Sequence, residues 1–257
     1  MKYLVLIVAL MAFSHSYSQV LDPANHYQVE ELPQVRASDV MWHRRLWREI
    51  DLTEKVNQHL YYPPKSENRN YALFDLLFHQ LKKGVIKAYG IESDDFKKEL
   101  SMSEIIGLTT DTLLVNGKIV TQEVDGKDIV KLWLKEDWFY NSKYSRIEVR
   151  IIGLCPVRIK KDRNGNILGY QQLVWFYFPH IRHVLVNYEA LKKQQADDPR
   201  VSFDDVFVKL RKFNSYIILN KVDQLEKVRE NKTELDVLLE NQETKVYLFN
   251  EKTMLWE

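Results

Sequence analysis

Residues 38–64 read SDVMWHRRLWREIDLTEKVNQHLYYPP and are the most distinctive stretch of this 257-residue chain. At about 100° per residue, the apolar side chains fall within an arc of roughly 160° and the charged ones fill the other side. Ser38 can cap the first turn, and the two prolines at the end cannot continue a helix. The pattern therefore predicts an amphipathic helix whose apolar stripe contains Val40, Trp42, Leu46, Trp47 and Ile50.

Two interpretations of this predicted helix stay open. In the first, the stripe is buried in the core of the same chain and the arginines are solvated. In the second, part of the segment docks another subunit, because Trp and Arg are enriched among the residues that dominate protein interfaces. The candidate interface residues are Trp42, Arg44, Arg45, Trp47 and Arg48.

The first 18 residues have the pattern of a secretory signal peptide. Lys2 precedes an apolar run from Tyr3 to Phe13, and Ser16 and Ser18 supply small residues for cleavage before Gln19. No cysteine lies near this cut, so we expect no lipid anchor. Removal of Lys2 would take the formal net charge from +1 to 1 − 1 = 0, which gives no case for nucleic acid binding.

Cys155 is the single cysteine, so an internal disulfide is impossible and stability must come from the hydrophobic core. Beyond the predicted signal peptide, the longest uninterrupted apolar run is residues 173–178, far short of a membrane span. We therefore expect a soluble exported protein, or one held at a membrane by a partner, without direct membrane insertion.

Local patterns predict the remaining elements. An Asn116-Gly117 pair between two apolar triplets indicates a tight β-hairpin, and Gly84 lies where a helix C-cap glycine belongs. The predicted helices cover residues 70–83, 101–106, 180–193 and 202–213. The predicted strands cover residues 85–89, 113–115, 118–120, 129–138, 146–159 and 167–178.

The order of these elements predicts an α+β fold, with a central antiparallel sheet flanked by N-terminal and C-terminal helices. Residues 19–37 contain two prolines and no apolar periodicity, so an extended arm is expected there. The α+β domain is expected to cover residues 38–220. Residues 221–257 form a charged tail that we expect to be helical or mobile.

Several blocks in this order resemble one family, the gliding-motility and Por secretion protein N group (GldN/PorN) of the type IX secretion system. The resemblance covers the chain from Ser38 to about Asn220. The first block has Trp42, Arg45, Trp47, Arg48, Ile50, Asp51, Leu52, Lys55, Asn57, Tyr62 and Pro63. The later blocks are residues 136–139, 149–154 with Pro156, 175–179 with Arg182, and finally Phe207, Arg211, Phe213 and Ser215.

The resemblance implies a non-enzymatic structural subunit in the periplasm. Such a subunit would form a ring from copies of itself together with an outer-membrane lipoprotein, the GldK/PorK component. The ring would work with the inner-membrane motor proteins L and M (GldM/PorM for the latter), supporting protein secretion and, in gliding species, motility.

An alternative class is a secreted carbohydrate-binding module or glycoside hydrolase. Glu136 and Asp137 could contribute one of the two carboxylates that glycosidases need, and Trp133, Trp138 and Trp175 could contact sugars. Paired carboxylates converging on these tryptophans in a cleft would favour this class.

Other chemical signals are weak. His180 and His183 have helical spacing but no evident third metal ligand. Residues 162–166 begin like a calcium loop, although Ile167 and Leu173 occupy the positions that require glycine and glutamate. The sequence contains no nucleophile elbow, phosphate-binding glycine loop or zinc-protease motif. We therefore expect no enzymatic activity, no cofactor and no metal.

Overall fold

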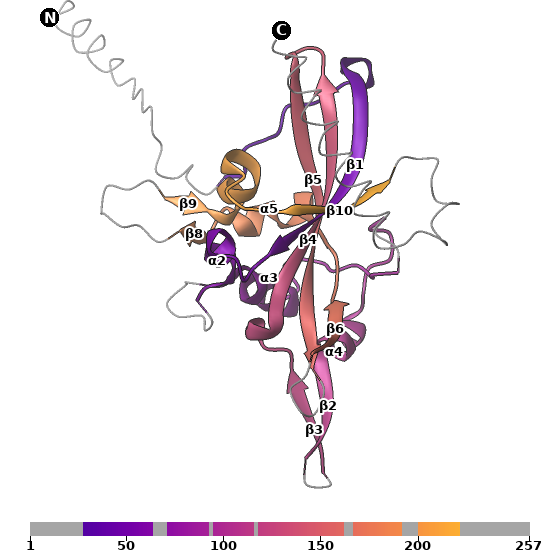
Figure 1. Cartoon of the computed structure of the whole chain (residues 1–257), viewed down its shortest axis with the longest axis vertical. Coiled ribbons are helices and arrows are strands. Elements are labelled where there is room, and N and C mark those ends of the chain that lie inside the picture. Colours follow the sequence, from indigo (N-terminus) through magenta and orange to yellow (C-terminus); the bar gives the residue numbers. More distant parts are fainter. Residues whose placement is uncertain are drawn as a thin grey trace, which may run out of the picture.

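A computed structural model of the chain (Figure 1) describes residues 28–63, 71–92, 95–115, 118–161, 167–191 and 200–221. The predicted signal peptide, the Asn116-Gly117 turn, the calcium-like loop at residues 162–166 and the tail after Lys221 lie outside these residues.

The described fold is centred on an antiparallel sheet with the strand order β10-β1-β4-β5-β6, and β7 also pairs with β5. Figure 1 shows β4 and β5 running along the long axis of the molecule, with a separate β2–β3 hairpin projecting at the lower end. The strands of the main sheet are β1 (Val40–Asp51), β4 (Ile129–Asn141), β5 (Arg146–Lys161), β6 (Ile167–Gln172), β7 (Phe176–Tyr177) and β10 (Tyr216–Lys221).

The other strands form two-stranded sheets, β2 (Thr110–Val115) with β3 (Lys118–Glu123), and β8 (Glu189–Leu191) with β9 (Val201–Ser202). The α-helices are α2 (Gln58–Tyr61), α3 (Leu73–Lys82), α4 (Met102–Thr109) and α5 (Phe178–Leu185). The 3-10 helices are η2 (Ala37–Asp39), η3 (Lys55–Asn57) and η4 (Gly126–Asp128), and η5 (Asp205–Leu210) is a π-helix. The predicted α+β class is confirmed.

The helix predicted from Ser38 is wrong, because residues 40–51 form strand β1. Ser38 caps nothing, and its hydroxyl donates a hydrogen bond to the Asp39 carboxylate at 3.3 Å. β1 pairs with β4 on one side and β10 on the other, so distant strands satisfy its backbone. Both faces of such a central strand are partly covered. Apolar residues can therefore be adjacent, as Leu46 and Trp47 are, and their spacing imitates a helix.

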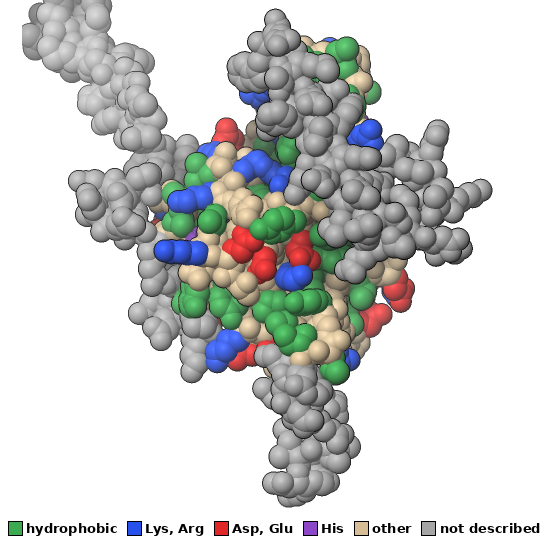
Figure 2. Space-filling model, in the orientation of Figure 1, with side chains coloured by type: hydrophobic (Ala, Val, Ile, Leu, Met, Phe, Trp, Pro, Cys, Tyr) green, Lys and Arg blue, Asp and Glu red, His purple; other side chains and the backbone are tan. Residues whose placement is uncertain are grey.

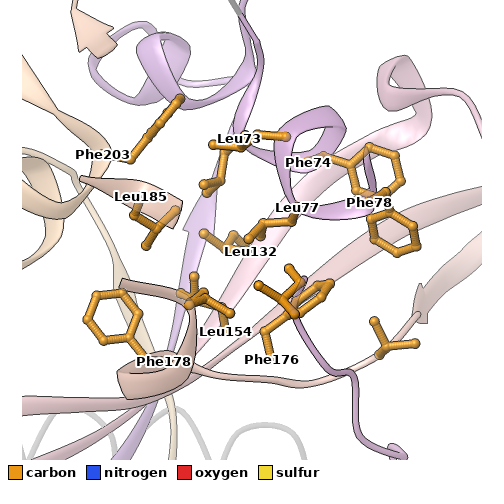
Figure 3. Close-up of a cluster of buried hydrophobic side chains, with 14 of the residues drawn as sticks. Leu73, Phe74, Leu77, Phe78, Leu132, Leu154, Phe176, Phe178, Leu185 and Phe203 are labelled. Atoms are coloured by element: carbon orange, nitrogen blue, oxygen red, sulfur yellow. The ribbon is translucent and has the colours of Figure 1, made fainter. Parts of the chain in front are cut away.

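The main core lies between the sheet and the helices α3 and α5 (Figure 3). Leu132 and Leu154 contribute from neighbouring strands β4 and β5, where they lie on the same face of the sheet. They contact the apolar residues of the helices and of the segment around β7 and η5, including Leu73, Phe74, Leu77, Phe78, Phe176, Phe178, Leu185 and Phe203. One continuous cluster therefore holds the N-terminal and C-terminal helices against the same sheet.

Strong local signals predicted α3, α4 and the hairpin correctly. Gly84 follows α3 with φ of +71°, the left-handed conformation expected of a C-cap glycine. Ser101 and Glu104 form a capping box at the start of α4, which continues to Thr109 and is longer than predicted. The strand predicted at residues 85–89 is reduced to isolated bridges of Tyr89 with Glu99 and Trp175.

The C-terminal helices are shorter than predicted. α5 ends at Leu185 because residues 189–191 pair with β9 instead of continuing the helix. Ser202 does cap the next helical segment, since its hydroxyl accepts a 3.1 Å hydrogen bond from the Asp205 N–H. That segment becomes the π-helix η5, and Arg211 ends it with φ of +44°. The predicted strand 167–178 is divided into β6 and β7, with Phe178 already in α5.

Candidate assembly surface

The five candidate interface residues all lie on β1, and the strand distributes them over two faces. Side chains alternate along a strand, so Trp42, Arg44 and Arg48 share one face while Arg45 and Trp47 point to the other. The separate tryptophan stripe and arginine face expected of a helix are therefore not formed. The two faces have different surroundings and are considered separately.

On the first face, Arg48 belongs to a buried ionic network, here called the Glu136 network. The carboxylate of Glu136 is fully buried and accepts hydrogen bonds from Arg211 Nη2 at 2.7 Å and Trp138 Nε1 at 2.8 Å. Arg48 Nη1 lies 3.9 Å from the same carboxylate, and its Nη2 donates to the Ser215 carbonyl at 3.2 Å. Two guanidinium groups thus surround one carboxylate, which leaves the network one positive charge in excess.

The Trp138 ring connects the members of this network. The guanidinium carbons of Arg48 and Arg211 lie 5.5 and 5.9 Å from its centroid, within the range of cation–π contacts. Burial lowers the pKa of Arg48, nearby Glu136 opposes that effect and Arg211 adds to it. Arginine remains protonated at physiological pH all the same. The network therefore fixes the segment after η5 to the centre of the sheet.

Further along the same face lies a partly exposed group that we call the Trp42 face, consisting of Trp42, Arg44, Tyr140, Ile147 and Val149. Tyr140 is the pairing partner of both Trp42 on β1 and Ile147 on β5. Trp42, Ile147 and Val149 pack against a small buried cluster that contains Leu46, Trp138 and Ile217. Tyr, Trp and Arg are enriched at interfaces, so this composition suits a docking surface.

On the opposite face, Arg45 and His43 converge on Asp137. Arg45 donates two hydrogen bonds to that carboxylate, from Nε at 2.7 Å and from Nη2 at 2.8 Å. His43 Nε2 lies 3.1 Å from the same carboxylate. Trp47 is buried in a cluster with Tyr89, Cys155 and Trp175, so its ring is not available to a partner protein.

The residues considered for sugar binding and glycoside hydrolysis are buried or bonded to other side chains of the protein. Trp138 and Trp175 are buried, and Trp133 donates its indole N–H to Glu49 at 2.9 Å. A cavity of about 190 Å³ lies among Phe74, Asp75, Phe78, His79, Lys82, Thr109, Glu123 and Val124, and contains none of these tryptophans. Glu136 and Asp137 are held by arginines, as described above, and neither lines that cavity.

The two spaced histidines, His180 and His183, are both exposed on α5, and the His180 ring contacts Tyr177 edge-on at 4.7 Å. Within the described residues, no group of three or more His, Cys, Asp or Glu side chains is placed to hold a metal ion. The part of the chain that the structure describes also contains no helix with the length and apolarity needed to cross a membrane.

Figure 2 shows hydrophobic side chains interleaved with acidic and basic ones on the described part of one molecular face. This mixture agrees with a formal net charge of +1 and gives no single-sign patch on that face. The Arg211–Glu136 pair could not be predicted from the sequence, because 75 residues separate the two partners and neither shows a local signal.

Comparison with protein-family models matches residues 35–257 to the family described as "Gliding motility associated protein GldN". The chain belongs to the GldN family. Membership makes it a component of gliding motility and type IX secretion, a system of the cell envelope, in which it works with other components of the secretion complex. No curated protein matches the chain.

Proposed function

We propose that this chain is a non-enzymatic structural subunit of the type IX secretion system. It assembles with copies of itself and with a GldK/PorK-like outer-membrane lipoprotein into a periplasmic ring, and a GldM/PorM-like motor protein contacts that ring. The family match over residues 35–257 is the observation that carries this proposal. The Trp42 face supports it, because aromatic, aliphatic and arginine side chains are partly exposed there together.

The proposal also gives a role to each segment that precedes or follows the domain. Residues 1–18 direct export and are removed, residues 19–37 are an arm on the 38–220 domain, and residues 221–257 contribute to assembly. The described part of the arm contacts the domain at two places. Lys209 Nζ lies 2.9 Å from the Glu30 carboxylate, and Arg150 donates a 3.1 Å hydrogen bond to the Pro33 carbonyl.

The direct test is the mass of residues 19–257 by light scattering, alone and coexpressed with the lipoprotein partner. A small species alone that becomes a very large assembly with the partner is the expected result. A monomer that ignores the partner would overturn the proposal, and glycan-binding and hydrolase assays would then test the alternative class.

A variant on the Trp42 face then locates the contact. Trp42→Ala with Arg44→Glu changes partly exposed side chains, so the variant should fold and yet assemble less. The matched control, His43→Ala with Arg45→Ala, lies on the opposite face of the same strand and should assemble normally. Arg48→Glu is unsuitable for this test, because it would place a second carboxylate beside buried Glu136 and unfold the protein.

A further inference from the structure

Among the described strands of the main sheet, the edge strand β6 lacks the features that usually prevent edge pairing, and the edge strand β10 has one of them only at its end, Lys221. β6 is the last strand on one side, and its sequence from Ile167 to Gln172 has no charged residue and no proline. Three of its apolar side chains are exposed, with relative accessibilities of 59% for Ile167, 64% for Leu168 and 56% for Tyr170. Natural edge strands are usually protected by charge, proline or a cover, because their free N–H and C=O groups can pair with another strand.

The opposite edge, strand β10, is also uncharged over most of its length. Among the described residues, β10 pairs with β1 and with no other strand. It is uncharged from Tyr216 to Asn220, and the Tyr216 side chain is 44% exposed. β6 and β10 are each six residues long, so the two edges match in length, and the single charged residue of β10 is Lys221 at its end.

We propose that β6 of one copy pairs with β10 of the next copy, so that the sheets of neighbouring subunits form one continuous sheet. A second copy is the occupant that the observations favour, because the chain itself carries the uncharged strand β6 and an uncharged stretch of β10, residues 216–220, at the two ends of one described sheet. A contact between two different surfaces of the same protein is heterologous, and its repetition closes into a ring when the rotation per subunit permits. The inference rests on the proposed function, since it specifies how the ring's copies contact one another.

Such a contact is too small to be stable by itself. A pair of six-residue strands buries much less than the roughly 1,200 Å² at the lower end of stable interfaces. Binding to the lipoprotein partner holds copies close together and raises their effective concentration, which strengthens a weak contact between them. The edge pairing should therefore be detected in the coexpressed complex rather than in the isolated chain.

Cysteine crosslinking in that complex tests the proposal. The native thiol of Cys155 is buried, so it should not contribute to crosslinking. Leu168→Cys or Tyr170→Cys on β6 is combined with Tyr216→Cys or Ile218→Cys on β10, which tests two positions along each edge strand. After mild oxidation, we expect a crosslinked dimer when a β6 variant is mixed with a β10 variant, and a ladder of higher oligomers when both cysteines are in one chain.

The other outcomes are equally informative. A crosslinked dimer from Leu168→Cys alone would indicate two β6 strands paired about a two-fold axis and would overturn head-to-tail pairing. A full-size complex in which no combination crosslinks would overturn the inference while the proposed function stands. Failure of the unmodified chain to assemble with the lipoprotein would overturn the proposed function, and the edge contact with it.

A charged edge provides the second measurement. Ile167→Lys with Leu168→Lys changes two exposed side chains, so the isolated chain should keep its thermal stability while the mass of the coexpressed complex falls several-fold. Ile106→Lys is the matched control, because Ile106 is 52% exposed but lies on α4 rather than on a sheet edge. Equal loss of mass in both variants would contradict a specific role for β6.

Discussion

Arg211 donates a 2.7 Å hydrogen bond to Glu136, whose carboxylate is fully buried in the middle of β4. Removal of this carboxylate leaves Arg48 and Arg211 side by side without their shared counter-charge. We therefore expect Glu136→Ala to lower the free energy of unfolding by roughly 3–5 kcal/mol, as for other broken buried ion pairs. Urea denaturation measures the change.

Glu123→Ala is the control for that prediction. Its carboxylate contacts Lys82 Nζ at 2.6 Å, but both side chains are largely exposed, so the expected loss is below about 1 kcal/mol. Equal losses for Glu136→Ala and Glu123→Ala would show that the Glu136 network contributes little to stability.

A second buried pair joins α5 to the segment before η5. Arg182 donates hydrogen bonds of 2.8 Å from Nε and from Nη2 to the two carboxylate oxygens of Asp204, and both residues are buried. Asp204→Ala should cost roughly 3–5 kcal/mol by urea denaturation. The double variant Arg182→Met with Asp204→Leu should recover much of that loss, because no unpaired charge remains. If the double variant is as unstable as Asp204→Ala, the unpaired charge is not the cause.

Gly153 is packed directly under the Phe96 ring. A Cβ at position 153 would lie 2.5 Å from Phe96 Cζ, and Phe96 itself has φ of +58°. The ring is held in place by edge-on contacts with Tyr89 and Trp175. Gly153→Ala should therefore cost about 1–3 kcal/mol through overpacking, as measured by thermal or urea denaturation.

A double-mutant cycle tests the cause of the Gly153→Ala effect. In a Phe96→Ala background the two shortest contacts are gone and only the 3.1 Å approach to Trp175 Cε3 remains, so the same glycine substitution should cost less. An unchanged cost would place the strain at Trp175 or in the backbone of β5 rather than at the Phe96 ring.

Asp75 at the start of α3 gives a pH-dependent prediction. Burial raises its pKa, and nearby Asp125 raises it further, while Lys82 and Glu123 line the same cavity. The folded state therefore favours the neutral form of the Asp75 carboxyl. Its contribution to stability is fully present below its unfolded pKa of about 4 and is lost as the pH rises through its pKa in the folded state. Asp75→Asn keeps a neutral side chain at every pH.

The variant should consequently have a higher Tm than the unmodified chain at pH 7, and the difference should disappear below about pH 4. Thermal denaturation followed by circular dichroism across this range measures both curves. A gain that is the same at pH 7 and below pH 4 would show that ionisation of Asp75 is not responsible.

Cys155 should be chemically silent in the folded protein. Burial raises the pKa of its thiol well above the ordinary value, so little reactive thiolate is present. A thiol reagent should label the native chain very slowly and the urea-unfolded chain rapidly. Fast labelling of the native chain would show that the sheet around Trp47 and Trp175 opens readily.

The sequence predicted those elements whose signals are local. Gly84 after α3 and the Ser101–Glu104 capping box concern neighbouring residues, and both are found as expected. β1 was mistaken for a helix because its pairing partners, β4 and β10, are distant in the chain and cover both of its edges. The apolar residues of β1 are distributed over both faces of the strand, so their spacing fits neither the helical period of 3.6 residues nor the strand period of two.

The candidate surface was predictable in composition but not in geometry. The tryptophans and arginines of β1 were identified, yet their separation onto two faces follows from the strand, and the involvement of Arg48 follows from Glu136 and Arg211. The exposed edge at β6 was missed as well, because the sequence alone does not show which strand ends the sheet.

The pairing of β1 with β10 also determines when the protein can fold. Among the described strands of this sheet, β1 comes first in the chain and β10 last, and Arg48 and Ile217 are direct pairing partners. The long loop between β1 and β10 must close, at a cost in chain entropy, before their pairing contributes favourable free energy. Pairing of β1 with β10 should therefore be slow compared with formation of the β4–β5 hairpin. A chain synthesised from its N-terminus can pair β1 with β10 only after residue 217 has been made, so the described sheet closes late and β1 must wait for a strand about 170 residues further along the chain.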